Sequence, residues 1–171
     1  VEVRREGQLT FLSSRASFEY RLWKVPLFSY AHEVSETYDE NLCLQSIDSS
    51  TKTRNNSLTV KGRKTEQGFV LEGTAPNELT ERCLITFAYW TQTILGKEQL
   101  LNGQDGSLMS VEISSLASAK ENSEQRYRLQ AKAIDLTLTY SDERLWQGLE
   151  SALPAGRTRN YRLERYRNQP F

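Results

Sequence analysis

The sequence predicts an all-β protein, folded as an antiparallel up-and-down barrel or a strongly curled half-barrel of about a dozen strands. Apolar and polar residues alternate along most of the chain, which is the period of a strand with one buried face. Pairs such as Glu6-Gly7, Asn55-Asn56 and Asp105-Gly106 predict turns between these runs. Helical spacing is scarce. A two-sheet β-sandwich is the alternative architecture, and a chain of 171 residues fits one domain over residues 1–171.

Each expected strand is a run of alternating residues; Phe18 and Tyr20, for example, stand between polar neighbours. The run from Leu9 to Leu22 would extend about 46 Å at about 3.3 Å per residue, so we expect a bulge or bend near Ser13-Ser14. The expected strands lie near residues 2–5, 8–22, 27–38, 41–51, 57–64, 68–73, 83–88, 98–101, 107–114, 125–132, 134–140, 144–151 and 158–166.

Two segments depart from the strand pattern. Residues 88–96 (AYWTQTILG) predict one short helical segment that stops at Gly96. Residues 115–124 are small and polar, which predicts a loop. The chain also opens at Val1, without Met and inside a strand-like run, which is consistent with a lost leader and a lost first hairpin.

Charge and hydropathy limit the classes of partner. The 22 basic residues balance the 22 acidic residues, whereas a domain that binds nucleic acid through its overall field carries a basic excess. No nucleic-acid partner is therefore expected. No run reaches the roughly 20 apolar residues of a membrane helix, so the chain is not expected to be transmembrane.

The two cysteines, Cys43 and Cys83, both lie in strand-like runs. A bridge between them would close a loop of about 40 residues and would stabilise the fold by about 3–4 kcal/mol in the chain-entropy view. Such a bridge persists in an oxidising compartment. Two buried reduced thiols are the other interpretation, and the residues alone leave this choice open.

Two segments have distinctive sequences, Cys83–Trp90 (CLITFAYW) and Leu100–Gly106 (LLNGQDG). Together with residues 30–33, 36, 43–44, 146 and 149–151, they resemble an uncharacterised bacterial family of exported all-β proteins, known only as a domain of unknown function. The similarity extends from about residue 15 onward. This chain has Tyr38 and Thr91 at positions where that family commonly has Trp and Asn.

The resemblance implies an all-β fold, export from the cytosol and a Cys43–Cys83 disulfide. It implies no particular activity, because that family has none established. In outline the family is also similar to the curved-sheet or barrel lipoprotein carriers and chaperones of the bacterial envelope. A periplasmic or otherwise exported bacterial protein is therefore expected.

No residue pattern supports catalysis, a metal or a cofactor. His32 is the single histidine, a bridged Cys43 could not act as a nucleophile, and the sequence has no G-x-S-x-G motif. His32 and Glu36 share a strand face, but a catalytic zinc site normally has three protein ligands. Residues 157–167 interleave arginines with tyrosines, which favours a solvated final strand over a nucleic-acid surface. We expect a protein that is not an enzyme and needs no cofactor.

Aromatic residues mark the candidate ligand site. The FAYW segment (Phe87–Trp90) brings several large apolar side chains next to a glycine-terminated turn. They would either plug the fold as part of its core or line a concave pocket for an apolar molecule. The candidate lining residues are Phe87, Tyr89, Trp90, Ile94, Leu95, Trp23 and Tyr30.

Two functions remain after these exclusions. The first is a non-enzymatic exported envelope protein that binds a lipid-like or other apolar ligand in a curved β-sheet. The second is an accessory or interaction subunit of a larger envelope or membrane-associated complex, holding a protein partner at an exposed edge or at its arginine-rich end. A large apolar cavity beside the FAYW segment would favour the first.

Overall fold

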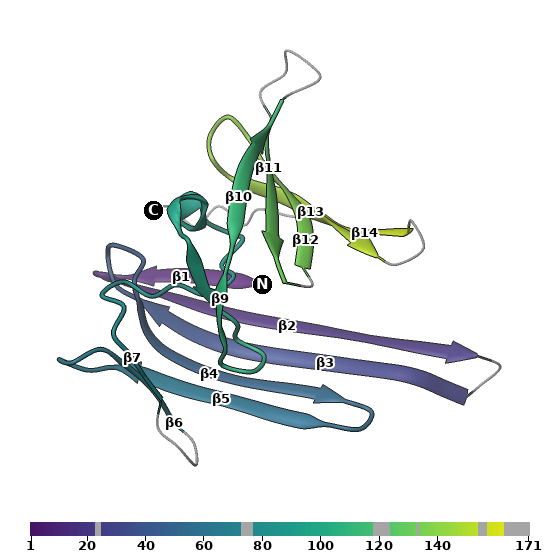
Figure 1. Ribbon diagram of the computed structural model, residues 1–171, viewed down its shortest axis with the longest axis horizontal. Coiled ribbons are helices and arrows are strands. Elements are labelled where there is room, and N and C mark those ends of the chain that lie inside the picture. Colours follow the sequence, from purple (N-terminus) through teal and green to yellow (C-terminus); the bar gives the residue numbers. More distant parts are fainter. Residues whose placement is uncertain (23–24, 73–76, 118–123, 133, 154–156, 163–171) are drawn as a thin grey trace. The chain divides into compact units, whose positions relative to one another are not determined.

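Strands dominate the computed structural model, which describes residues 1–22, 25–72, 77–117, 124–132, 134–153 and 157–162. They form sheets of seven, five and two strands (Figure 1). The all-β prediction is therefore confirmed. The chain divides into two compact units, one made of Val1–Thr86 with Leu101–Ser107 and the other of Phe87–Leu100 with Leu108–Phe171. The expectation of one domain over residues 1–171 stays a prediction.

The first unit holds the seven-stranded sheet, in which strands pair in chain order and each neighbouring pair is antiparallel. Its turns follow from the sequence: Gly7 has a φ of 59°, and the Thr53 N–H donates to the Asn56 carbonyl at 2.8 Å. The strands are β1 (Glu2–Glu6), β2 (Leu9–Leu22), β3 (Val25–Tyr38), β4 (Leu44–Thr53), β5 (Ser57–Lys64), β6 (Phe69–Glu72) and β7 (Asn77–Leu79).

The longest strands, β2 and β3, run side by side past the ends of β4 and β5 (Figure 1). Their ladder is continuous at Ser13 and Ser14, so the bulge predicted there is wrong. The irregularity lies between Tyr20 and Arg21, where Arg21 stands opposite Pro26. Proline has no N–H to donate, so the ladder is interrupted at this pair instead.

The two faces of this sheet differ in burial. Leu12, Glu36 and Ile47 are paired across β2, β3 and β4, and all three are buried. The residues beside them in sequence, such as Ser13 and Ser35, are exposed. Strand alternation therefore gives the sheet one buried face and one polar, solvent-exposed face.

The LLNGQDG sequence forms a loop that packs on the buried face. The Ser49 hydroxyl donates to the Gly103 carbonyl, and the Thr51 hydroxyl donates to the Gln104 carbonyl at 3.4 Å. Gly106 has a φ of 75°, and a Cβ at this position would lie 3.4 Å from a methyl carbon of Leu71. Glycine therefore suits the left-handed backbone at this position, while the added Cβ would make only ordinary van der Waals contact with the sheet.

The second unit holds the five-stranded sheet, also paired in chain order. Leu129, Leu138 and Tyr140 are fully buried on one face, while Arg128 and Asp135 form an ion pair on the other. Its strands are β10 (Glu112–Leu116), β11 (Gln125–Ala131), β12 (Ile134–Tyr140), β13 (Trp146–Leu153) and β14 (Arg157–Arg162).

The part of the sequence that connects β7 to β10 is less regular than predicted. The expected helical segment at 88–96 is confirmed only as the 3₁₀ helix η1 (Gln92–Gly96), which begins after Thr91 caps it. The expected strand at 83–88 is wrong, since this stretch makes one isolated bridge, Thr86 to Leu101. The expected strand at 107–114 divides into β9 (Leu108–Ser110), which pairs with β8 (Gln99–Leu101), and β10.

No sheet closes on itself among the described strands, so the expected closed barrel is not formed. β1 and β7 are the edges of the seven-stranded sheet, and β10 and β14 are the edges of the five-stranded sheet. The irregular stretch from Thr80 to Thr91 interrupts the hairpin ladder, which divides the strands between separate sheets. The two-sheet alternative therefore fits the strand pairing.

Candidate functional site

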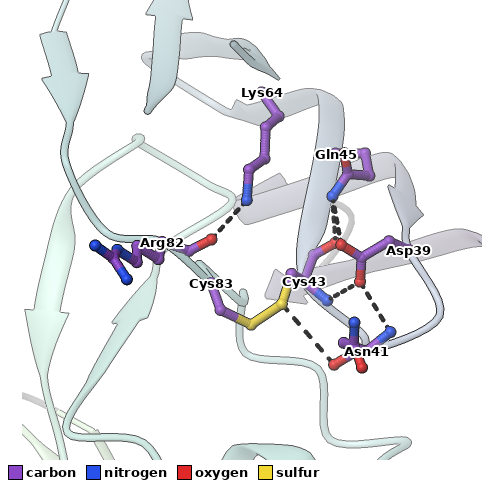
Figure 2. The surroundings of a disulfide bond; sticks show 7 residues. All are labelled: Asp39, Asn41, Cys43, Gln45, Lys64, Arg82 and Cys83. Atoms are coloured by element: carbon purple, nitrogen blue, oxygen red, sulfur yellow. Dashed lines mark hydrogen bonds between the residues drawn. A yellow bond between two sulfur atoms is a disulfide. The ribbon is translucent and has the colours of Figure 1, made fainter. Parts of the chain in front are cut away.

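A disulfide joins Cys43 and Cys83, with 4.7 Å between their Cα atoms (Figure 2). The predicted bridge is confirmed. It ties the irregular stretch after β7 to the start of β4. The Leu44 N–H donates to the Leu84 carbonyl at 2.7 Å, and the Lys64 ammonium donates to the Arg82 carbonyl. The disulfide and the Leu44–Leu84 hydrogen bond thus hold the same two segments together, and Lys64 links the irregular stretch to β5 as well.

Asp39 organises the turn that presents Cys43 (Figure 2). Its Oδ1 accepts hydrogen bonds from the main-chain N–H groups of Asn41 at 3.0 Å and Cys43 at 2.9 Å. Its Oδ2 accepts from the Gln45 amide at 2.9 Å. Leu42 adopts a left-handed φ of 58° inside this turn. Three donors on one carboxylate offset the strain of that residue and fix the position of the cysteine.

A buried polar cluster of Glu36, Tyr38 and Thr86 lies in the first unit. The Tyr38 hydroxyl donates to Glu36 Oε2 at 2.6 Å and lies 2.8 Å from the Thr86 hydroxyl. Burial raises the pKa of Glu36, while the hydrogen bonds from Tyr38 and Thr86 oppose this shift. Burial and the neighbouring Glu36 charge raise the pKa of Tyr38 well above its ordinary value. The cluster therefore stabilises a carboxyl group that water does not reach.

Sequence reasoning missed this cluster. The signal was available, because Glu36 occupies an inward position between Val34 and Tyr38 in an alternating strand. Its partner Thr86 could not be found in this way, since it lies 48 residues from Tyr38 in the sequence.

His32 is part of the sheet packing. Its Nδ1 lies 2.9 Å from the Thr51 hydroxyl, and its ring stacks on Tyr30 with 6.4 Å between centroids. Burial lowers the pKa of His32, which favours the neutral imidazole. The described residues contain no group of three or more His, Cys, Asp or Glu side chains placed to hold a metal ion.

The FAYW segment and η1 are anchored to the five-stranded sheet of the second unit. The Tyr140 hydroxyl donates to the Tyr89 carbonyl at 2.8 Å, and the Thr91 carbonyl lies 3.4 Å away. The Gln92 amide donates to the Gln125 side chain at 3.1 Å. Because Tyr140 is itself fully buried, its hydroxyl fixes the segment to the interior of this unit.

The proposed lining residues have different environments. Ile94 is fully buried, whereas Phe87, Tyr89, Trp90 and Leu95 are half-buried. The rings of Phe87 and Tyr89 meet edge to face at 6.2 Å between centroids. These five predicted residues are neighbours in the sequence, within residues 87–95, and all belong to the second unit.

The two remaining predicted residues lie apart from this group. Tyr30 belongs to the first unit, on β3. Trp23 lies outside the described residues.

The apolar face of the five-stranded sheet continues past the segment that covers it. Tyr127, Leu138, Leu149 and Tyr161 form one row across β11, β12, β13 and β14. Leu138 is 0% exposed, Leu149 is half-buried and Tyr161 is 45% exposed. Sequence reasoning did not include Leu149 and Tyr161 in the site, although alternation places them on the apolar face.

Among the described residues no helix has the length and apolar character needed to cross a membrane. No curated protein and no solved structure matches the chain. The profile of one family, described as Domain of unknown function (DUF6134), matches residues 1–164. This match confirms the predicted kinship to a domain of unknown function. The chain therefore belongs to the DUF6134 family.

Proposed function

We propose that this protein is a non-enzymatic exported protein of the bacterial envelope that binds a lipid-like or other apolar ligand on the five-stranded sheet, beside the FAYW segment. The observation that carries this proposal is the rise in exposure along one apolar row, from Leu138 at 0% to Tyr161 at 45%. Apolar surface left in water costs about 25 cal/mol per Å². An apolar ligand would therefore be stabilised on this row of Tyr127, Leu138, Leu149 and Tyr161, which we call the strip.

Other residues of the same unit add to its apolar surface. Phe87, Tyr89, Trp90 and Leu95 are each half-buried there.

The disulfide supports the part of this proposal that places the protein outside the cytosol. A bridge between Cys43 and Cys83 persists where thiols are oxidised, which in bacteria is the periplasm or the cell exterior. Lipid-like molecules that cross this aqueous space need a protein surface that shields them.

Displacement of a fluorescent fatty acid by oleate tests the proposal. We expect the oxidised protein to bind the probe, and Tyr161→Ser to weaken binding at least several-fold because it removes the exposed end of the strip. Asn160→Ser is the matched control, since Asn160 is exposed on the neighbouring position of β14. Absence of probe binding, or equal binding by both variants, would contradict a ligand site on this face.

A second candidate function, an accessory subunit with a protein partner, is favoured by one observation. All five residues of β1 are exposed, and this strand is an edge of the seven-stranded sheet. An edge strand presents main-chain donors and acceptors that another chain can pair with. Light scattering of the purified protein would show a stable homomer if the partner is a second copy of this chain. If the protein is a monomer, its partner would have to be a different protein.

A further inference from the structure

The exposed face of the seven-stranded sheet carries two adjoining hollows, of about 430 and about 750 Å³. Glu2, Ser13, Ser35 and Asp48 line both of them. These four residues are paired in one row across β1, β2, β3 and β4. The hollows therefore form one continuous trough over this row.

Side-chain size explains the trough. Its centre is formed by the short side chains of Ser13 and Ser35, while the longer Glu2 and Asp48 side chains stand at its ends. The parallel rows on the same face add more hydroxyl groups, among them Thr37, Ser46 and Ser50. Buried-face residues such as Leu12 also line the hollows, and alternation means that they do so with their main chain.

Two ion pairs lie along the trough. Arg15 Nε lies 2.8 Å from Glu33 Oε1, and Lys61 Nζ lies 2.9 Å from Asp48 Oδ2. Because Arg15 and Lys61 each face a carboxylate and Glu2 adds another, the side chains of the trough have no cationic excess to attract an anion. It offers fixed donors and acceptors side by side, which suits a neutral ligand that has both kinds of group.

One aromatic ring interrupts the polar lining. Phe11 is half-buried on β2, and the Arg4 guanidinium lies 5.7 Å from its ring centroid. Thr37 is its cross-strand neighbour. An apolar ring beside hydroxyl groups matches a molecule with C–H faces and hydroxyl edges.

We propose that this trough is a binding site for a neutral oligosaccharide. Sugar hydroxyls both donate and accept, so they can pair with the serine and threonine hydroxyls and with the Glu33 and Asp48 carboxylates. A sugar C–H face can pack on the Phe11 ring in place of the Arg4 guanidinium. Each of the two hollows has a volume in the range of small-molecule sites, and the open shape suits an extended chain held by several weak contacts.

The site is separate from the proposed apolar site, since every residue that lines it belongs to the first unit. The two proposals can therefore fail independently. A substitution in the trough should leave oleate binding unchanged, and Tyr161→Ser should leave oligosaccharide binding unchanged.

Titration with cellohexaose, maltohexaose and chitohexaose, followed by amide chemical shifts, tests the proposal. We expect at least one of these probes to shift the resonances of residues 11–15, 33–37 and 46–50. Ser13→Trp fills the trough and should weaken binding at least tenfold. Ser17→Trp is the control, because Ser17 is exposed on the same face of β2 but does not line either hollow. Tryptophan is well tolerated in strands, so both variants should fold.

Three results would overturn the site. The first is that none of the hexasaccharides shifts the trough resonances at millimolar concentration. The second is that Ser13→Trp and Ser17→Trp bind equally strongly. The third is that the protein binds only sulfated or carboxylated oligosaccharides and releases them at high salt, which would indicate charge attraction instead of hydroxyl recognition.

Discussion

Glu36 carries a carboxyl group and has only 6% of its surface exposed. Whether burial of this group destabilises the fold depends on the hydrogen bonds that its neighbours make to it. The Tyr38 hydroxyl donates to it, and Thr86 in turn contacts that hydroxyl. A buried polar group with satisfied hydrogen bonds can fix a unique arrangement, whereas one without them destabilises the fold. Because Thr86 lies in the irregular stretch, this cluster stabilises that stretch against β3.

Glu36→Gln should change the pH dependence of stability. Burial raises the pKa of Glu36, so the folded state keeps its proton to higher pH than the unfolded chain. The contribution of Glu36 to the free energy of unfolding is therefore fully present below the ordinary pKa of 4.5. It is lost as the pH rises through the pKa that Glu36 has in the folded protein. The glutamine variant keeps an acceptor for Tyr38 without a charge, so it should gain stability relative to wild type as pH rises.

Urea unfolding between pH 4 and pH 8 measures this difference, since the other carboxyl groups contribute equally to both proteins. Glu33→Gln, on the exposed face of the same strand, controls for the substitution itself. A constant stability difference across this pH range would show that Glu36 has the same pKa in the folded and unfolded chains.

At the scale of elements, hydrogen bonds from one tyrosine connect the FAYW segment to the sheet beneath it. The Tyr140 hydroxyl contacts the carbonyls of Tyr89 and Thr91, and Thr91 is the residue that caps η1. Thr91 also accepts from the Thr93 N–H at 3.2 Å. The position of the 3₁₀ helix therefore depends on contacts of a β12 residue as well as on its own cap.

Tyr140→Phe should loosen this segment without unfolding the sheet. The ring that fills the core remains, and the loss is one buried hydrogen bond with an acceptor left unpaired, which costs about 1–3 kcal/mol. Hydrogen exchange should become faster at residues 89–93 and stay unchanged along β11 and β12. Tyr161→Phe is the control, because Tyr161 lies on β14, two strands away from Tyr140 in the same sheet. Equal protection in wild type and Tyr140→Phe would mean that packing alone holds the segment.

The strands show how far sequence alone reaches. The expected runs at 8–22 and 134–140 agree closely with β2 (Leu9–Leu22) and β12 (Ile134–Tyr140), because strong alternation sets both the element and its buried face. Leu84 and Ile85 are as apolar as a strand requires and are fully buried, but they pair with no full strand. Burial determined their residue types, and periodicity could not distinguish this from strand pairing.

At the scale of the whole molecule, local patterns define the hairpins but not which hairpins share a sheet. Meander pairing follows from short turns, whereas the division into seven-stranded and five-stranded sheets depends on the irregular stretch that follows β7. The candidate sites show the same limit. The row from Tyr127 to Tyr161 and the serine trough each combine residues from four strands, so register was needed to recognise them.

The disulfide is the longest-range constraint that the sequence did reveal, since Cys43 and Cys83 have a sequence separation of 40. Replacing both with serine should lower the free energy of unfolding by about 3–4 kcal/mol, because the unfolded chain regains the entropy of an open loop of this length. The melting temperature should fall by several degrees for a domain of this size. Dithiothreitol should lower the melting temperature of wild type to a similar extent and leave the double variant unchanged. If reductant shifts both proteins equally, the effect comes from the solvent and the bridge contributes nothing to stability.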